Sequence, residues 1–329
     1  MAINLQSRIF VAGHRGLVGS AILRALRQTG YGNLLTRTHS ELELRDESSV
    51  RAFFREHRPE YVFLAAAKAG GIAANNDFPA DFVRDNLLIE LNMIDAARET
   101  GIEHMLFLGS SCIYPKLALQ PIPESALLTG PLEPTSRPYA VAKIAGIEMC
   151  WAFNRQYGTR YVAVMPTNLY GPGDNYDLHT SHVIPALVRR FVEACRDRAA
   201  EVIVWGSGTP RREFLHSDDL AQACLTLMTL PDDKLDSLAR SEEHPPLVNI
   251  GYGKDVTIAE LAQWIAELSG FQGKIGFDKT KPDGTPRKLL DSSRMRSLGW
   301  APRISLRDGL QEIIRMIATQ PPQSSTFSV

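Results

Sequence analysis

A glycine-rich turn near the start of the chain limits the possible folds more than any other stretch. It reads Gly13-His14-Arg15-Gly16-Leu17-Val18-Gly19, follows an apolar run over residues 8–12, and leads into apolar residues at helical spacing up to Gly30. This pattern predicts a strand, a tight turn and a helix. Glycines let a backbone approach a pyrophosphate closely, and a helix N-terminus offers free N–H groups to it. A lone motif of this kind can be a mere turn, but its position between strand and helix favours a dinucleotide site.

Strand-like and helix-like stretches alternate after that turn. Strands are expected over 33–37, 60–66, 104–109 and 160–167, and helices over 49–57, 85–101 and from residue 139 onward. Such alternation is typical of a parallel sheet with helices on both faces. We therefore predict an α/β fold with a Rossmann-like doubly wound parallel sheet and a smaller C-terminal α/β substrate lobe.

The composition excludes several classes of function. The chain has 329 residues, of which 44% are hydrophobic and 22% charged, and its net charge of −1 gives no field that would attract nucleic acid or an anionic membrane. No apolar run approaches the roughly 20 residues that a membrane-spanning helix needs. The four cysteines have no Cys-x-x-Cys spacing and the start is not signal-like, so we expect a cytoplasmic protein with neither disulfides nor bound metal.

The tip of the second expected strand indicates which dinucleotide is bound. It reads Arg37-Thr38-His39 and has no acidic residue for a ribose hydroxyl. Together with Arg15 in the first loop, these cations suit a ribose 2′-phosphate, so NADP(H) is favoured over NAD. The alternative is that both arginines are solvated surface charges.

Two parts are expected along the chain. Residues 1–172 should form the NADP-binding Rossmann domain, with later segments near 200–230 returning to it, and residues 173–319 should mainly form the substrate lobe. The segment 281–288 is too rich in charge and turn residues to form an element, and the tail 320–329 is predicted to be disordered. Elements expected after residue 172 are helices over 182–198, 257–270 (capped by Thr257) and 304–319, and strands over 202–205, 247–251 and 274–278.

Candidate catalytic residues come from two neighbouring segments. Tyr139 and Lys143 stand four residues apart in a predicted helix, so they share a face on which the ammonium could stabilise the phenolate. Ser110 and Cys112 follow the fourth strand, at the edge where parallel sheets bind ligands. Such a tyrosine and lysine are often only a core ring and a solvated charge, and a free cysteine is often a small buried filler. Because the same chain also contains the glycine-rich turn, we favour the catalytic interpretation of these residues.

The order of these motifs makes the chain resemble the extended short-chain dehydrogenase/reductase superfamily. Longer strings make it resemble one family within it, the GDP-L-fucose synthases, over about residues 8–318. These strings are Gly13-His14-Arg15-Gly16, Ala65-Ala66-Ala67-Lys68, Gly109-Ser110-Ser111-Cys112-Ile113-Tyr114-Pro115-Lys116, Pro166-Thr167-Asn168-Leu169-Tyr170-Gly171-Pro172 and Lys281-Pro282-Asp283-Gly284-Thr285-Pro286-Arg287-Lys288.

The resemblance implies a two-step reaction. GDP-4-keto-6-deoxy-D-mannose would be epimerised at C3 and C5, and NADPH would then reduce the C4 ketone to give GDP-L-fucose. Because the ketone acidifies both neighbouring C–H bonds, inversion needs a base on one face and an acid on the other. The resemblance assigns these roles to Cys112 and His182, whose ordinary pKa values of about 8.5 and 6.5 we expect to be tuned toward neutrality. His179 is nearby, but the matching string surrounds His182.

The same resemblance assigns the remaining roles. Tyr139 would protonate the C4 oxygen, Ser110 would hydrogen-bond it, and Lys143 would bind the nicotinamide ribose and lower the pKa of the phenol. A homodimer is also implied, through the helices that contain Asp85 and Tyr139. Cofactor contacts would come from Gly13, His14, Arg15, Gly16, Leu17, Val18, Gly19, Arg37, His39, Leu108, Gly109, Ser111, Lys143, Pro166, Thr167, Asn168 and Leu169, and GDP-sugar contacts from Arg190, Trp205, Arg212 and Asp283.

One residue departs from the family's pattern, and several other functions compete with the one that the resemblance implies. His39 stands where the family typically has an arginine, so 2′-phosphate binding would lean on Arg15 and Arg37, and the preference for NADP could be relaxed. The GDP-sugar residues could also be rim charges. Rival functions are a 4,6-dehydratase, a 4-epimerase and a non-catalytic NADP sensor. A dehydratase usually has Thr-Asp-Glu in place of Ser110-Ser111-Cys112, and a sensor would have no reason to keep a catalytic tyrosine and lysine.

Overall fold

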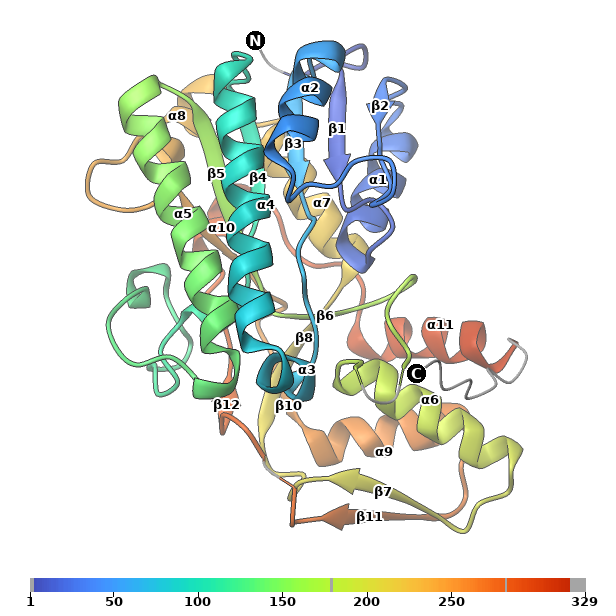
Figure 1. Ribbon diagram of the computed structural model, residues 1–329. Helices are drawn as coiled ribbons and strands as arrows, with labels where there is room; N and C mark the ends of the chain where they lie inside the picture. Colours follow the sequence, from blue (N-terminus) through green and yellow to red (C-terminus); the bar gives the residue numbers. More distant parts are fainter. Residues whose placement is uncertain (1–2, 178–179, 282, 320–329) are drawn as a thin grey trace.

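Six parallel strands form the central sheet of the part of the chain that the structure, a computed structural model, describes: residues 3–177, 180–281 and 283–319 (Figure 1). Their order across the sheet is β2-β1-β3-β4-β5-β9. The strand order reverses between β1 and β3, and ligands of open α/β sheets bind at the carboxyl ends beside such a point. The predicted Rossmann-like doubly wound sheet is confirmed. The strands are β1 (Ile9–Ala12), β2 (Leu34–Leu35), β3 (Tyr61–Leu64), β4 (His104–Leu108), β5 (Arg160–Pro166) and β9 (Leu247–Ile250).

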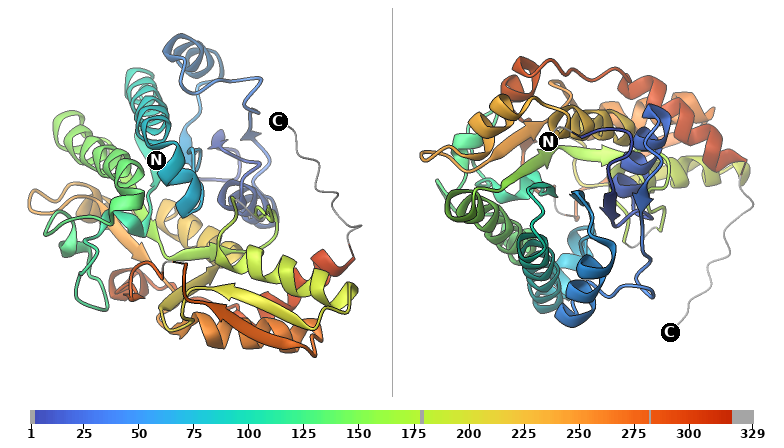
Figure 2. Two further views of the ribbon diagram at one scale, coloured as in Figure 1. Left: turned by 60° about the horizontal axis from the view of Figure 1, so that its bottom comes forward. Right: turned by 90° about the horizontal axis from the view of Figure 1, so that it is seen from above.

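Helices cover both faces of this sheet, which Figure 2 shows from two further directions. Successive strand residues point to opposite faces, so Ile9 and Val11 enter one core while Phe10 and Ala12 enter the other. The first face carries α1 (Leu17–Thr29), α7 (Ser217–Met228), α8 (Asp232–Ala239) and α10 (Ser293–Ser297), and the second carries α2 (Glu47–His57), α4 (Pro79–Glu99) and α5 (Arg137–Tyr157).

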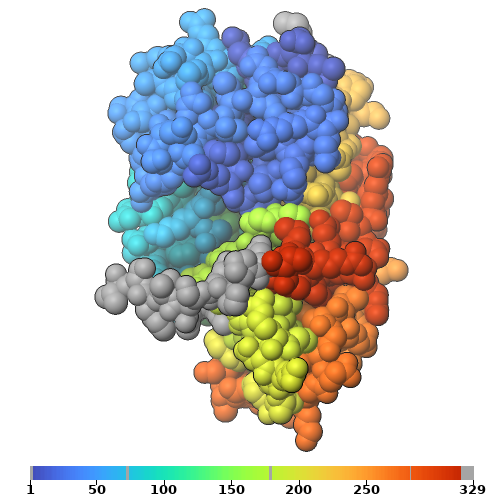
Figure 3. All heavy atoms as spheres, turned by 90° about the vertical axis from the view of Figure 1, so that its right-hand side faces the viewer, coloured from blue at the N-terminus to red at the C-terminus, as the bar shows by residue number. Residues whose placement is uncertain are grey.

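A smaller lobe lies beside the carboxyl edge of the sheet and has a core of its own. In Figure 3 it occupies the lower half of the molecule, below the blue N-terminal part. Strand β8 pairs with β6, β10 and β12, and β7 pairs with β11. Its elements are β6 (Asn168–Tyr170), α6 (Val183–Arg196), β7 (Glu201–Trp205), β8 (Arg211–His216), β10 (Asp255–Thr257), α9 (Ile258–Ser269), β11 (Lys274–Asp278), β12 (Arg287–Lys288) and α11 (Leu306–Ala318).

Capping explains where several helices begin. Helix α2 starts two residues before the predicted position because the Asp46 side chain accepts a hydrogen bond from the Ser48 backbone. Helix α4 starts six residues early, with Pro79 in its first turn. The predicted cap of α9 is confirmed, since Thr257 and Glu260 form a reciprocal capping box.

Other expectations need correction. Segment 281–288 was expected to form no element, but Arg287 and Lys288 form β12, because they pair in parallel with Arg211 and Arg212 of β8. Helices α3 (Ile72–Asp77) and α7 were not expected. Strands β7 and β8 lie in the smaller lobe, whereas α7 and β9 pack with the large sheet, and the domain division at residue 172 stays a prediction. The predicted disordered tail and His179 lie outside the described residues.

No helix in the described ranges is long and apolar enough to cross a membrane.

Candidate active site

The glycine-rich turn joins β1 to α1 without room for larger residues. Gly13 has φ of 82°, in the left-handed region, and a Cβ added to it would lie 2.7 Å from the backbone nitrogen of Ala66. A Cβ on Gly19 would lie 2.2 Å from the carbonyl oxygen of Gly13. Gly16 is the N-cap of α1 and provides no side-chain cap, so the first-turn N–H groups are available to a ligand.

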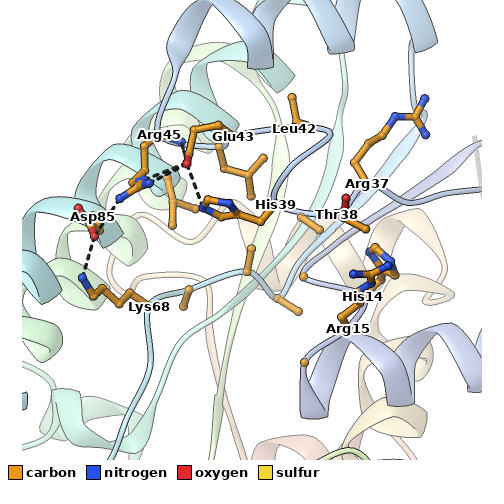
Figure 4. Close-up of a pocket in the computed structure, with 18 of the residues that line it drawn as sticks. His14, Arg15, Arg37, Thr38, His39, Leu42, Glu43, Arg45, Lys68 and Asp85 are labelled. Carbon is orange, nitrogen blue, oxygen red and sulfur yellow. Dashed lines mark hydrogen bonds and ion pairs between the residues drawn. The ribbon is translucent and has the colours of Figure 1, made fainter. Parts of the chain in front are cut away.

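A cavity of about 590 Å³ opens at this turn (Figure 4). Its wall comes from the turn at 13–16, the segment after β2 at 37–39 and 42–45, the end of β3 at 65–68, and Asp85 with Ile89 of α4. The lining combines apolar side chains with cations, two of which, Arg45 and Lys68, pair with Glu43 and Asp85 of the same wall. Such a lining suits an adenosine with phosphate groups. The backbone cradle at Gly13 and Gly19, which a side chain would fill, therefore fits a dinucleotide.

The three predicted 2′-phosphate ligands differ in their surroundings. Arg15 lies beside His14 at the mouth of the turn. Arg37 points away from them, because it donates to the Thr36 carbonyl at 2.8 Å and to His57 Nε2 at 2.9 Å. His39 lies 2.9 Å from Glu43, and the Arg45 guanidinium bonded to Glu43 lowers the pKa of that carboxyl to about 2.

Helix α5 places Tyr139 and Lys143 on one face, as predicted. The ammonium lies 5.8 Å from the centroid of the Tyr139 ring and 4.7 Å from that of Phe107 on β4. The expected lowering of the phenol's pKa is not seen. Burial, together with the charges of Cys112 and Glu90, raises the pKa of Tyr139 well above its ordinary value.

Ser110 and Cys112 lie directly after β4. Ser110 caps a short 3₁₀ turn, and its hydroxyl accepts a hydrogen bond from the Cys112 backbone N–H at 3.4 Å. Burial raises the pKa of the Cys112 thiol, while Lys288, Ser110 and Lys143 act in the opposite direction. Because Cys112 also raises the pKa of Tyr139, the thiol and the phenol occupy the same site.

His182 belongs to the smaller lobe. It is the N-cap of α6, and its side chain is accessible to solvent although protein atoms crowd around it. This crowding and the Lys288 charge lower the pKa of the imidazole. The pKa values of Cys112 and His182 therefore move away from neutrality rather than toward it, since desolvation dominates both.

The predicted GDP-sugar residues lie together in the smaller lobe. The Arg190 guanidinium lies 5.1 Å from the centroid of the Trp205 ring, which is 55% exposed. Arg212 Nη2 donates to the Asp283 carbonyl at 3.3 Å. The Asp283 carboxylate accepts hydrogen bonds from the Ser207 N–H and hydroxyl at 2.7 and 2.8 Å. Burial lowers the pKa of both arginines, so an anionic ligand would be favoured here.

The remaining predicted cofactor residues lie at the carboxyl ends of β4 and β5, on the same edge as the glycine-rich turn. Gly109 donates to the Val164 carbonyl at 2.9 Å and leaves no room for a side chain beside Met165. The Thr167 hydroxyl and the Asn168 amide both donate to the Glu213 carbonyl, at 3.1 and 3.0 Å. Leu108, Ser111, Pro166 and Leu169 share this edge.

Comparison with known proteins agrees with this geometry. The model of the "NAD dependent epimerase/dehydratase family" matches residues 9–251. GDP-L-fucose synthase 1 of Arabidopsis thaliana is 58% identical, with 93% of this chain and 91% of the relative covered. GDP-L-fucose synthase of Escherichia coli is 56% identical, with 93% and 94% covered. The chain belongs to the GDP-L-fucose synthase family. This assignment confirms the resemblance found in the sequence.

A solved structure extends the comparison. The GDP-mannoheptose C4 reductase MlghC from Campylobacter jejuni, with NADP bound, is 36% identical and superimposes with a TM-score of 0.87. The alignment covers 97% of this chain and 100% of that chain. The fold shared with that reductase therefore extends over both lobes, including the smaller lobe beyond residue 251.

Two residues near the candidate catalytic groups were missed as site residues. Lys288 stands on β12 opposite Arg212, and its charge acts on both Cys112 and His182. The matching string 281–288 contains it, and that string was the available signal. Glu90 lies 3.1 Å from Lys143 in a buried ion pair. No local motif marks it, because the contact depends on the packing of α4 against α5.

Proposed function

We propose that this protein converts GDP-4-keto-6-deoxy-D-mannose to GDP-L-fucose by epimerisation at C3 and C5 followed by NADPH-dependent reduction at C4. The observation that supports it best is that the Cys112 thiol acts on the Tyr139 phenol, while Lys288 of the smaller lobe acts on both Cys112 and the His182 imidazole. Identity of 56–58% to curated GDP-L-fucose synthases over most of the chain also supports it.

NADP(H) is the proposed cofactor. The glycine-rich turn and the first turn of α1 would hold its pyrophosphate, and the cavity of Figure 4 would hold its adenosine. Arg15 is proposed to bind the 2′-phosphate, because the Arg37 guanidinium is already bonded to Thr36 and His57 and the His39 ring lies against the Glu43 carboxylate. The chemistry that NADPH supplies when bound is a hydride for C4 of the sugar.

Epimerisation is proposed to use Cys112 and His182. A base removes the proton from C3 or C5 and leaves an enolate, and an acid returns a proton to the opposite face. Cys112 must lose its proton to act as the base, and the Lys288 charge favours that loss. His182 belongs to the opposite lobe, at the N-cap of α6, and would deliver the proton to the other face of the sugar.

Reduction is proposed to use Tyr139, Ser110 and Lys143. As the hydride reaches C4, the phenol gives its proton to the ketone oxygen, which Ser110 hydrogen-bonds. Tyr139 becomes a phenolate that the Lys143 ammonium stabilises until the phenol regains a proton from water. Arg190, Arg212 and Trp205 are proposed to hold the GDP portion, with Asp283 fixing the loop beside them.

A homodimer is proposed to form through α4 and α5. These two helices pack side by side on one face of the sheet (Figure 1). Leu87 and Leu91 of α4 and Val141 of α5 remain 37%, 45% and 42% exposed. Leu87 and Leu91 are four residues apart, so they share one helix face. An exposed apolar surface of this kind is typical of an interface.

Replacement of Tyr139 by phenylalanine tests the proposed function. NADPH oxidation with GDP-4-keto-6-deoxymannose should fall by about 10²–10⁴-fold, because the proton donor is lost. Solvent deuterium exchange at C3 and C5, followed by NMR, should continue at the wild-type rate. Failure of the wild-type protein to oxidise NADPH with this sugar would refute the function, and loss of exchange in step with reduction would refute the division of roles.

A further inference from the structure

A buried ion pair lies beside Tyr139. The Lys143 ammonium on α5 is 3.1 Å from Glu90 Oε1 on α4, and the two side chains are 1% and 2% exposed. Removing a carboxylate and an ammonium from water costs several kcal/mol for each ion, so such a pair is expensive for a fold to keep. The epimerisation and reduction steps described above assign no role to Glu90.

The surroundings of Glu90 hold its carboxylate at one place. Neither of its oxygens receives a well-aligned hydrogen bond from the described residues. A Cβ added to Gly146 would lie 2.8 Å from Glu90 Oε2 and 2.4 Å from the Phe107 ring, so the glycine makes the space that the carboxylate occupies. The ammonium also lies over the Phe107 ring at 4.7 Å. Apolar walls and a single cation therefore define the position of this charge.

The Glu90 carboxyl holds its proton more tightly than an exposed carboxyl does. Burial raises the pKa of its carboxyl to about 7, although the Lys143 ammonium acts in the opposite direction. The titratable groups that face it are Lys143, Tyr139 and Cys150, all on α5, and β4 presents the ring of Phe107. The Glu90 charge raises the pKa of Tyr139, so the two groups are coupled in the structure.

We propose that Glu90 is a positioning residue for the reduction step. It holds the Lys143 ammonium beside Tyr139. By binding or releasing a proton, it also sets how strongly that ammonium favours the phenolate. This inference rests on the proposed function for the role of Tyr139. When Glu90 is ionised, its charge balances Lys143, and a phenolate would leave a net negative charge in a buried site. When Glu90 is protonated, the ammonium acts on the phenol alone, and Tyr139 gives up its proton more readily.

The pH profile of the reduction tests this proposal. NADPH oxidation by the wild-type protein, measured under single-turnover conditions with GDP-4-keto-6-deoxymannose, should fall several-fold as the pH rises through about 7. Glu90→Gln keeps the shape of the side chain but cannot ionise, so it should stay near the low-pH level. Glu148→Gln makes the same change at a partly exposed site on α5 and should behave as the wild type. Retention of the fall in Glu90→Gln would overturn the proposal.

Two further readouts separate this proposal from a purely structural role. Deuterium exchange at C3 and C5 does not use Tyr139, so its rate should be the same in Glu90→Gln and the wild type. A general loss of both steps would indicate disturbed folding and overturn the positioning role. Glu90→Asp restores a carboxylate on a shorter arm, so it should restore a pH-dependent fall at a displaced pH. If Glu90→Gln does not fold, Glu90→Asp decides alone, and a profile without any displacement would count against the proposal.

A substrate-free measurement distinguishes failure of this inference from failure of the proposed function. The alkaline absorbance difference between the wild type and Tyr139→Phe reports ionisation of the Tyr139 phenol. The same difference is then measured between Glu90→Gln and the double variant Glu90→Gln/Tyr139→Phe. Its midpoint should lie at a lower pH, by on the order of one unit. An unchanged midpoint would overturn the coupling even if the wild type reduces the sugar. A lowered midpoint would sustain it even if the sugar proves to be a different one.

Discussion

At the scale of single residues, Lys288 connects the two candidate groups for epimerisation. Its charge lowers the pKa of both the Cys112 thiol and the His182 imidazole, against the stronger effect of burial on the thiol. Replacing Lys288 by glutamine should therefore raise both pKa values. The alkaline limb of deuterium exchange at C3 and C5, which reports thiolate formation, should move to higher pH by on the order of one unit.

NMR measurement of exchange between pH 6 and 10 would check this expectation. Lys279→Gln removes a charge from an exposed position just after β11 and is the matched control. An exchange profile that Lys288→Gln leaves unmoved would show that the cation does not act on the thiol.

Most candidate site residues could be predicted because their signals are local, whereas their electrostatics could not. Tyr139 and Lys143 share a face of α5 simply because they are four residues apart in a helix. The directions of the pKa shifts at Tyr139, Cys112 and His182 depend on atoms and charges from segments far apart in the chain, which no single segment encodes. Glu90 was missed for the same reason, since α4 and α5 must pack before it meets Lys143.

At the scale of elements, the turn between β1 and α1 depends on the absence of a side chain at Gly19. A Cβ there would lie 2.2 Å from the Gly13 carbonyl oxygen, which is backbone and cannot yield easily. Gly19→Ala should lower the free energy of unfolding by about 1–3 kcal/mol and weaken NADPH binding by at least about tenfold. Urea unfolding and a fluorescence titration with NADPH measure the two effects.

Gly32→Ala is the control for this prediction. A Cβ at Gly32 would have no atom within 4 Å, so the substitution should change neither quantity appreciably. Equal NADPH affinity in Gly19→Ala and the wild type would show that the turn can widen without loss of the binding site.

The elements that could be predicted are those with strong local patterns. The buried strands β3, β4 and β5 have continuous apolar runs, and α9 has both its capping box and its C-terminal glycine. Helix α7 was missed because its cap is the uncommon His216, whose ring accepts from the Asp218 N–H. Strand β12 was missed because two residues become a strand only when β8 provides their hydrogen-bond partners.

At the scale of the whole molecule, the proposed dimer makes a prediction about mass. Leu91→Glu places a charge on the exposed apolar face of α4, where Leu91 is 45% exposed. A charge buried without a partner is strongly unfavourable, so this variant should be monomeric when the wild type is dimeric. Analytical ultracentrifugation would measure both, with Leu119→Glu, on a loop residue that is 87% exposed, as control. A wild-type monomer, or a dimer that survives Leu91→Glu, would contradict this interface.

Stability of the whole molecule should depend on pH through Glu90. Its pKa is raised from 4.5 to about 7, so the folded protein binds a proton that the unfolded chain has already lost between these values. The stability that this group contributes is therefore complete below pH 4.5 and is lost as the pH rises through about 7. Glu90→Gln does not titrate. Relative to the wild type, the variant should gain about 3 kcal/mol of unfolding free energy between pH 4.5 and 8.

Urea unfolding of both proteins across this range measures the difference directly. Comparing the variant with the wild type cancels the opposing contribution of the histidines with lowered pKa values, His14, His104, His182 and His216, which favour folding as the pH rises. Glu90→Gln also leaves Lys143 without its buried partner, which offsets the stability of the variant as a whole. The attraction of Lys143 is already part of the Glu90 pKa, so this offset adds nothing to the pH-dependent difference. A difference that rises only between pH 4.5 and 7 would identify the proton on Glu90 itself as its cause, and a difference independent of pH would show that this carboxyl is ionised throughout.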